Sequence, residues 1–333
     1  MRGAAGALGL AAILAAPLAG QTSHLVIVAG LDGDAALGAT MHTWAAAMVD
    51  AAVQRGVAAE DVVYLAPEPS RDPGRIDGES RKELVEAALR ELAGRAAPDA
   101  TVFIVLLGHG SHRGEESRFN LPGPDMSAAD FAALLDGFPT QTVVFVNTTS
   151  ASGGFLPVLS GANRVVVTAT KSGNERNLTT FGGHFANALA GDGADVDKDG
   201  RVSVLEAFTY ARTEVARSYE RGNRLLTEHA MLDDDGDGTG SAEPGASAGD
   251  GGLARGVFLA GGVGAPVAAV PATDDPELRR LYNERTDLER RVALLRRQKD
   301  DLDSETYERR LEALLLELAM TNRSIREREG GDQ

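Results

Sequence analysis

The stretch Thr101–Ser111 reads TVFIVLLGHGS, a run of seven β-branched or apolar residues that ends in glycine and histidine. Short apolar runs bounded by turn residues are typical of strands that are buried on both faces. A second such run, Val143–Val146, leads into Asn-Thr-Thr-Ser-Ala-Ser-Gly-Gly at 147–154. In an open α/β sheet, ligands and chemistry collect in the crevice outside the carboxyl ends of the strands. We therefore expect His109 and Ser150 to lie together at this edge.

The rest of the chain from residue 21 to 262 alternates between strand and helix patterns, which predicts an α/β fold with a doubly wound, mostly parallel sheet. The further expected strands are His24–Gly30, Val62–Leu65, Val165–Thr168 and, last, Gly256–Ala260. The expected helices are Met41–Val53, one that Ser80 caps and that runs to about Leu92, and one that Ser127 caps and that runs to Leu135.

The two glycine-rich strand ends resemble a known motif. A strand that ends in His-Gly, followed by a strand that ends in Asp-Ala-Cys-x-Ser-Gly, is the signature of the legumain-like and caspase-like (clan CD) cysteine peptidases. The chain resembles this family over about residues 24–260, because His109-Gly110 matches the first half and Ser152-Gly153 the end of the second. Ser150 then stands where the family has its cysteine, and Thr148 where it has the aspartate.

The chain contains no cysteine, so no thiolate from this chain can be the nucleophile. A cysteine is partly thiolate near neutral pH, whereas a serine needs a well-placed base and usually a third, orienting group. This favours an inactive or redirected peptidase site. The alternatives are an active endopeptidase that uses Ser150 and His109, and an ordinary turn and cap without catalytic role. The resemblance implies that the backbone N–H groups of Gly110 and Ser150 form an oxyanion hole.

A third loop, Thr170–Asn177, follows the strand Val165–Thr168 and is expected at the same edge of the sheet. Its charged side chains either line a specificity pocket or stay solvated. The sequence leaves both interpretations open.

The stretch 195–206 fits the twelve-residue calcium loop at each diagnostic position. Asp195, Asp197 and Asp199 stand at positions one, three and five, Gly200 at six, Arg201 with its carbonyl at seven, Ser203 at nine and Glu206 at twelve. Hard oxygen ligands at this spacing suit Ca²⁺ far better than a soft metal. The prediction is a calcium site of the EF-hand type, and the alternative is an acidic, solvated turn.

A second acidic stretch, 233–244, begins with the same rhythm but has Glu243 at position eleven and Pro244 at twelve. Proline has no side-chain oxygen and stops a following helix. This stretch either holds calcium weakly, contributes oxygens to a shared site, or forms a flexible acidic loop.

Residues 1–20 have the layout of a secretory signal peptide, with Arg2, an apolar stretch and small residues before Gln21. The apolar stretch is too short, and its flanks are too poor, to predict a membrane span. We therefore expect export to the periplasm or beyond. The net charge of −16 argues against nucleic acid and anionic membranes as partners, since both favour clustered Lys and Arg.

The C-terminal part is expected to be a separate helical unit after a Pro-, Ala- and Gly-rich linker at 263–276. Apolar residues recur there at heptad spacing, with a change of phase near residues 300–305. They are Leu278, Leu281, Leu288, Val292, Leu295, Leu302, Tyr307, Leu311, Leu314, Leu318, Thr321 and Ile325. The pattern predicts a helical hairpin or coiled coil over 277–328, which packs either on the α/β domain or on a second copy of the chain.

These observations favour an exported, calcium-binding relative of the legumain-like and caspase-like peptidases, and they allow three roles. The preferred role is a module without cysteine peptidase activity that binds a peptide or protein ligand. The second is a serine-dependent endopeptidase, and the third is a structural protein that assembles through residues 277–328.

Overall fold

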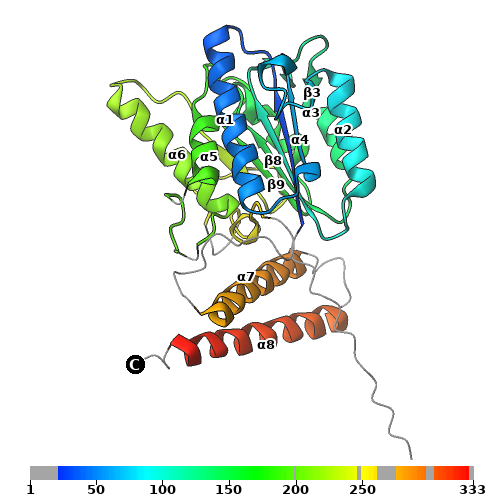
Figure 1. Ribbon diagram of the computed structural model, residues 1–333, viewed down its shortest axis with the longest axis vertical. Coiled ribbons are helices and arrows are strands. Elements are labelled where there is room, and N and C mark those ends of the chain that lie inside the picture. Colours follow the sequence, from blue (N-terminus) through cyan, green and yellow to red (C-terminus); the bar gives the residue numbers. More distant parts are fainter. Residues whose placement is uncertain are drawn as a thin grey trace, which may run out of the picture.

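The computed structural model describes residues 22–191, 193–198, 200–245, 249–260, 275–297 and 304–329 (Figure 1). The predicted signal peptide, the calcium-loop residue Asp199 and the linker residues 263–274 lie outside these ranges.

The centre of the molecule is a seven-stranded sheet with the order β10-β9-β8-β4-β1-β2-β3. Its strands are β1 (Ser23–Ala29), β2 (Val62–Ala66), β3 (Gly78–Glu79), β4 (Thr101–Leu107), β8 (Thr142–Asn147), β9 (Arg164–Thr168) and β10 (Met231–Asp233). All neighbouring pairs are parallel except β10 and β9. The predicted α/β class with a doubly wound, mostly parallel sheet is confirmed.

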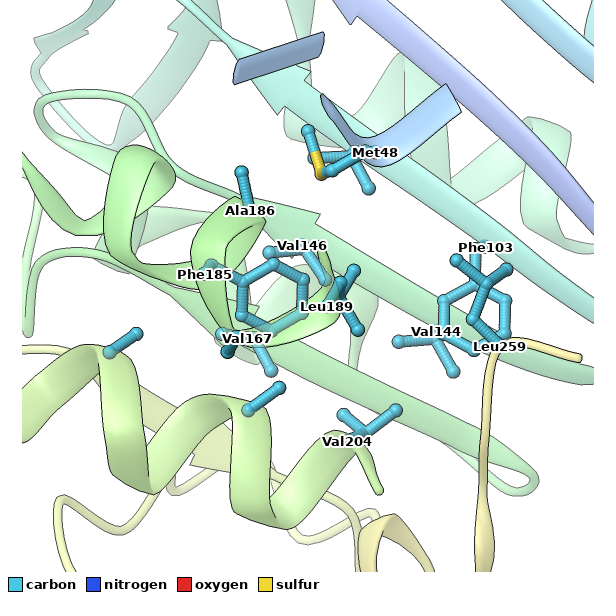
Figure 2. Packing of buried hydrophobic residues seen from close by; sticks show 14 of the residues in the cluster. Met48, Phe103, Val144, Val146, Val167, Phe185, Ala186, Leu189, Val204 and Leu259 are labelled. Atoms are coloured by element: carbon cyan, nitrogen blue, oxygen red, sulfur yellow. The ribbon is translucent and has the colours of Figure 1, made fainter. Parts of the chain in front are cut away.

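Helices cover both faces of this sheet (Figure 1). One face is covered by α1 (Ala35–Gln54), α5 (Phe181–Ala190) and α6 (Val204–Arg221), and the other by α2 (Lys82–Arg95), α3 (Ala128–Leu135) and α4 (Leu156–Leu159). Successive β4 side chains therefore enter two cores, with Phe103 on the first side and Ile104 on the second. Figure 2 shows the first core, where Phe103 and Val144 pack near Leu259.

A small antiparallel sheet follows β4 and is built from the residues directly after His109. Its strands are β5 (Gly110–Arg113), β6 (Glu116–Phe119) and β7 (Met126–Ser127), in that order. Short 3-10 helices occur at η1 (Ala59–Asp61), η2 (Pro69–Arg71), η3 (Ser152–Gly154) and η4 (Ala254–Gly256). Ser127 caps α3 as predicted, in a capping box with Asp130.

Two local predictions are wrong. The last strand of the sheet is β10, not Gly256–Ala260, which instead begins in η4 and forms a single bridge between Phe258 and Ser203. Residue 259 is a buried leucine of the main core, so the apolar pattern there reflects packing, not strand pairing. The N-cap of α2 is Arg81, and the Ser80 hydroxyl is buried without a hydrogen-bond partner.

Two long helices, α7 (Pro276–Arg297) and α8 (Ser304–Glu329), form an antiparallel hairpin beneath the α/β domain (Figure 1). Most of the predicted apolar positions line the seam, and Leu302 lies outside the described residues. Leu281 near the start of α7 packs with Ile325 near the end of α8, and Val292 packs in the cluster of Leu314. Contacts between α7 and η4 join the hairpin to the domain. No helix among the described residues is long and apolar enough to span a membrane.

Candidate functional site

The two predicted loops meet at the carboxyl ends of β4 and β8, which are neighbouring strands. The strand order reverses between β1 and β4, because β1 is followed in sequence by β2 on one side and β4 lies on the other. This is the point where open α/β sheets bind ligands. The His109 imidazole faces the loop after β1, since its Nε2 atom lies 3.4 Å from the position that a Cβ atom would take on Gly33.

The Ser150 hydroxyl is held by the backbone of Gly110. It donates to the Gly110 carbonyl oxygen at 3.0 Å and accepts the Gly110 N–H at 3.2 Å. Ser150 is only 4% exposed. Among the described contacts, no hydrogen bond joins Ser150 to His109. The structure thus places Ser150 and His109 at one edge of the sheet. Their side chains are not hydrogen-bonded to each other as nucleophile and base, and serine activation requires that pairing.

The residue at the aspartate position of the family motif is also engaged elsewhere. The Thr148 hydroxyl donates to the Leu106 carbonyl oxygen at 2.7 Å, inside the sheet. The neighbouring Asn147 accepts hydrogen bonds from the Thr149 N–H and hydroxyl. These contacts fix the strand end and leave no carboxylate beside His109 from this loop.

Two glycines of the motif are required by packing. A Cβ atom on Gly110 would lie 2.2 Å from the Ser150 carbonyl oxygen, and one on Gly153 would lie 2.2 Å from the Ser172 nitrogen. Such distances are far inside van der Waals contact, so neither position accepts a larger residue without a shift of the backbone. The loops after β4, β8 and β9 are therefore pressed against one another at this edge.

The loop Thr170–Asn177 is held in place by hydrogen bonds and is not freely solvated. The Glu175 carboxylate contacts the His229 Nδ1 atom at 2.6 Å and accepts the Lys171 N–H at 3.1 Å. The Glu175 carbonyl oxygen accepts the Ala151 N–H at 2.7 Å, next to the candidate nucleophile. The Arg176 guanidinium is exposed and donates to the His112 carbonyl oxygen. Of the loop's charged side chains, Lys171 and Arg176 face solvent at this edge.

A second serine and histidine lie close together, and the sequence motifs do not indicate them. The His112 Nδ1 and Ser117 Oγ atoms are 2.8 Å apart, and the Ser117 hydroxyl also donates to the Ala151 carbonyl oxygen at 3.4 Å. Ser117 is 1% exposed, so no substrate reaches it. The pair connects the small antiparallel sheet to the loop after β8 and has a structural role.

The start of α5 is fixed by a buried carboxylate, Glu228. It accepts the N–H groups of Thr180 and Phe181 at 2.7 to 3.0 Å and the Thr180 hydroxyl at 3.1 Å. The adjacent Thr179 hydroxyl donates to the carbonyl oxygen of Thr148. Burial raises the pKa of Glu228, and these N–H donors oppose the shift. The Glu228 carboxylate thus anchors the segment that supports the strand end of β8.

A cavity of about 240 Å³ opens beside these loops, at the carboxyl ends of β1 and β2. Its polar lining includes Asp32, His42, Tyr64, Glu68 and Arg71. Burial raises the pKa of Tyr64 to about 12, so the phenol stays neutral beside the His42 Nδ1 atom, 3.3 Å away. The cavity is smaller than the clefts that bury drug-sized ligands and has the scale of one side chain.

The predicted calcium loop lies at the opposite edge of the sheet, between α5 and α6. Asp195, Asp197 and Glu206 each bring a carboxylate oxygen within 4.8 Å of the other two. One Asp195 oxygen accepts the Gly200 N–H, and the other is buried without a partner. An orphaned carboxylate oxygen among acidic neighbours fits a cation. Asp199 lies outside the described residues.

The ends of this loop are organised as a helix start. Ser203 caps α6 in a capping box with Glu206, whose other oxygen accepts the Val196 N–H at 2.9 Å. Glu206 thereby joins the loop to the helix through hydrogen bonds within the protein. The Arg201 guanidinium stacks on the Phe258 ring, 3.7 Å from the ring centre, so the Arg201 side chain is not a candidate ligand. This contact does not involve the Arg201 carbonyl oxygen, which is the predicted ligand.

The second acidic stretch has a partner that its sequence pattern does not include. Asp233 and Asp235 lie with Asp250, and each of the three brings a carboxylate oxygen within 4.8 Å of the others. Asp250 lies beyond the twelve-residue window, so a loop pattern cannot find it. The pKa of Asp250 is raised to about 6, and burial is the main cause. The negative charges of the neighbouring Asp235, Asp233 and Asp234 also raise the pKa of Asp250.

The sequence matches no protein-family model, and no curated protein matches it. Among solved structures, the fold is similar to caspase-1 from Spodoptera frugiperda, with a TM-score of 0.42 and 13% sequence identity. The similarity covers 64% of this chain and 86% of the caspase chain. At this level it assigns neither a family nor an activity to the chain.

Proposed function

We propose that this chain is a non-catalytic, legumain-like or caspase-like module that binds a peptide or protein segment at the carboxyl edge of its sheet. In this proposal it is exported, binds calcium at 195–206 and has lost peptidase activity. The observation that carries the proposal is the Ser150 hydroxyl, which donates to the Gly110 carbonyl oxygen and not to the His109 imidazole.

The chemical reason is that a serine reacts only when a base removes its proton. The Ser150 hydroxyl donates its hydrogen bond to the Gly110 carbonyl oxygen, which is too weak a base to remove the proton. The Gly110 N–H, which the family resemblance implies as an oxyanion donor, is also engaged by the Ser150 hydroxyl. The candidate nucleophile and one of the two oxyanion donors are therefore engaged inside the protein, whereas the loops that shape this edge of the sheet remain.

The cavity at the ends of β1 and β2 supports peptide recognition. It has the scale of one side chain and carries carboxylates from Asp32 and Glu68 beside the Arg71 guanidinium. Arg71 contacts both acids, at 3.9 Å and 3.1 Å, so its charge is shared between them. Two carboxylates and one guanidinium leave a net negative cavity, which favours a basic or hydrogen-bond-donating side chain of the ligand.

Peptide cleavage tests the loss of activity. The mature protein, Ser150→Ala and Ser150→Cys are incubated with a diverse peptide library, with and without calcium. We expect no cleavage by the wild type or by Ser150→Ala. Cleavage by the wild type that Ser150→Ala abolishes would establish a serine-dependent endopeptidase instead. Activity gained only by Ser150→Cys would show that the peptidase geometry survives and that the nucleophile alone was lost.

Peptide capture tests the binding role. A displayed peptide library is selected on the wild type, and the selected peptides are measured against Asp32→Asn and, as a matched control, Asp99→Asn. Asp99 is exposed and precedes β4, at the other edge of the sheet. We expect basic peptides whose binding weakens about tenfold with Asp32→Asn and is unchanged with Asp99→Asn. Equal binding by both variants would place recognition elsewhere.

Calcium binding by the 195–206 loop rests on the orphaned Asp195 oxygen and the grouping of three carboxylates. A calcium ion would satisfy that oxygen and stabilise the native state by mass action. We expect Glu206→Gln to lower the calcium affinity at least tenfold. Glu220→Gln, an exposed residue of the same helix, serves as the control. Equal calcium affinity in the two variants would refute this site.

A further inference from the structure

Asp233 is a fully buried carboxylate at the end of β10. One of its oxygens accepts the Gly236 N–H at 3.1 Å, and the other has no hydrogen-bond partner. Burial of a carboxylate without full compensation is costly. The Ser160 hydroxyl and the Gly238 N–H offset part of this cost, and the second oxygen of Asp233 stays available to a cation.

Two further carboxylates surround this position. Asp235 and Asp250 each bring an oxygen within 4.8 Å of the others and of Asp233. Two oxygens on one Ca²⁺ ion, each at about 2.4 Å, are at most about 4.8 Å apart. The three carboxylates thus already meet the distance limit for a shared calcium ion. A calcium ion takes six to eight oxygens, and the others come from backbone carbonyls and water.

The fold, and not the local sequence, brings Asp250 to this position. The Asp250 carbonyl oxygen accepts the Gly245 N–H at 2.9 Å, and its carboxylate accepts the Asp234 N–H at 2.9 Å. In a standard loop, position twelve supplies the closing carboxylate, but here that position is Pro244. Asp250 supplies the carboxylate that Pro244 lacks.

Asp234 acts as a positioning residue. Its carboxylate is buried and accepts the N–H groups of Gly251, Leu253 and Ala254 at 2.7 to 2.8 Å. These bonds fix the segment that follows Asp250. They also use the Asp234 oxygens, so Asp234 is not counted among the ligands.

No positive side chain neutralises this cluster within the described part of the chain. Among those residues, no Lys or Arg forms an ion pair with Asp233, Asp235 or Asp250, and the nearby Arg212 contacts Glu243. The three carboxylates therefore repel one another, and a bound divalent cation would remove this repulsion.

We propose that Asp233, Asp235 and Asp250 form a second Ca²⁺ site, separate from the 195–206 loop and independent of the peptide-binding role. The site joins the end of β10 to the segment that leads into η4. It lies at the edge of the sheet that is opposite to His109 and Ser150.

Calcium counting on the full chain tests this site. The protein is stripped with a chelator and titrated with Ca²⁺ in a calorimeter, and the number of bound ions is confirmed by equilibrium dialysis. The variants are Asp250→Asn and Asp235→Asn for the new site, Glu206→Gln for the 195–206 loop, and Glu243→Gln as a control that removes one exposed charge nearby. Asp235 is exposed, so its substitution reports on binding without risk to folding.

We expect two ions in the wild type and in Glu243→Gln, and one ion in each of the other three variants, with the lost affinity reduced at least tenfold. If Asp250→Asn and Asp235→Asn both keep the wild-type number of ions and affinities within twofold, the second site is refuted. If the wild type binds one ion that Asp235→Asn removes and Glu206→Gln does not, the second site stands and the 195–206 loop is refuted.

Discussion

Glu228 offers a sharp test of how the strand-end site is supported. Replacement of Glu228 by alanine removes the acceptor of the Thr180 and Phe181 N–H groups and of the Thr180 hydroxyl. Phe181 is fully buried, so its N–H has no access to water after the change. Because Thr179 in the same segment bonds the Thr148 carbonyl oxygen, the loss reaches the loop that carries Ser150.

The magnitude follows from these contacts. One buried N–H left without an acceptor costs about 1 to 3 kcal/mol, and the loss of a negative charge at a helix N-terminus costs about 0.3 to 1 kcal/mol. The half-buried Thr180 groups regain water and add little. We expect Glu228→Ala to lower the free energy of unfolding by about 1 to 4 kcal/mol, and Glu228→Gln, which keeps one acceptor oxygen, by about 1 kcal/mol.

The pH dependence has a definite sign. Burial raises the pKa of Glu228 above that of the unfolded chain, so the native state binds this proton more tightly. Its contribution to stability is therefore fully present below the ordinary glutamate pKa and is lost as the pH rises through the raised value. In Glu228→Gln, which does not titrate, this part of the decline is absent.

Urea denaturation at several pH values measures both effects. Glu220→Ala, an exposed residue on α6, is the matched control and should change stability by less than about 0.5 kcal/mol. If Glu228→Ala costs no more than Glu220→Ala, the carboxylate does not anchor α5. If Glu228→Gln declines with pH as the wild type does, the titration belongs to another group.

Three further outcomes are expected. Burial lowers the pKa of His24, so its contribution to stability is lost as the pH falls below the ordinary histidine value of about 6.5, and His24→Gln should flatten the pH dependence of urea midpoints there. Gly110→Ala should cost about 2 kcal/mol because its Cβ would meet the Ser150 carbonyl oxygen, whereas Gly94→Ala, with open space around it, should stabilise α2 by about 0.5 kcal/mol; equal midpoints would contradict the packing argument. If residues 277–328 mediate self-association, sedimentation of the full chain should depend on concentration and that of a chain truncated at Pro276 should not.

A strand of the sheet could be predicted where its own residues form a long apolar run. The strand at Thr101–Leu107 is apolar throughout because helices cover both of its faces, and the strand bounds agree residue for residue. β10 was missed because three residues carry no periodicity, and its last residue, Asp233, also begins an acidic loop. Its place in the sheet depends on pairing with β9, which is a tertiary contact.

The candidate site was predictable in position but not in detail. Spacing along consecutive strands predicts that the loops of His109 and Ser150 share an edge, because parallel strands end together. It does not predict which acceptor the Ser150 hydroxyl meets, since a rotation about one bond decides this. Asp250 lies outside the loop pattern for a similar reason, because backbone contacts of Gly245 and Asp234 bring it to Asp233.

The two edge strands of the sheet influence whether the folded chain aggregates at high concentration. Its two edge strands, β3 and β10, are two and three residues long. The outer side of β10 is already paired, because the Leu232 and Ser241 backbones exchange hydrogen bonds at 2.8 and 2.9 Å. An exposed edge is a template on which other chains add strands and aggregate. Because both edge strands are short and β10 is already paired, little of that template is left, which protects a cysteine-free protein that has no disulfide to hold its sheet closed.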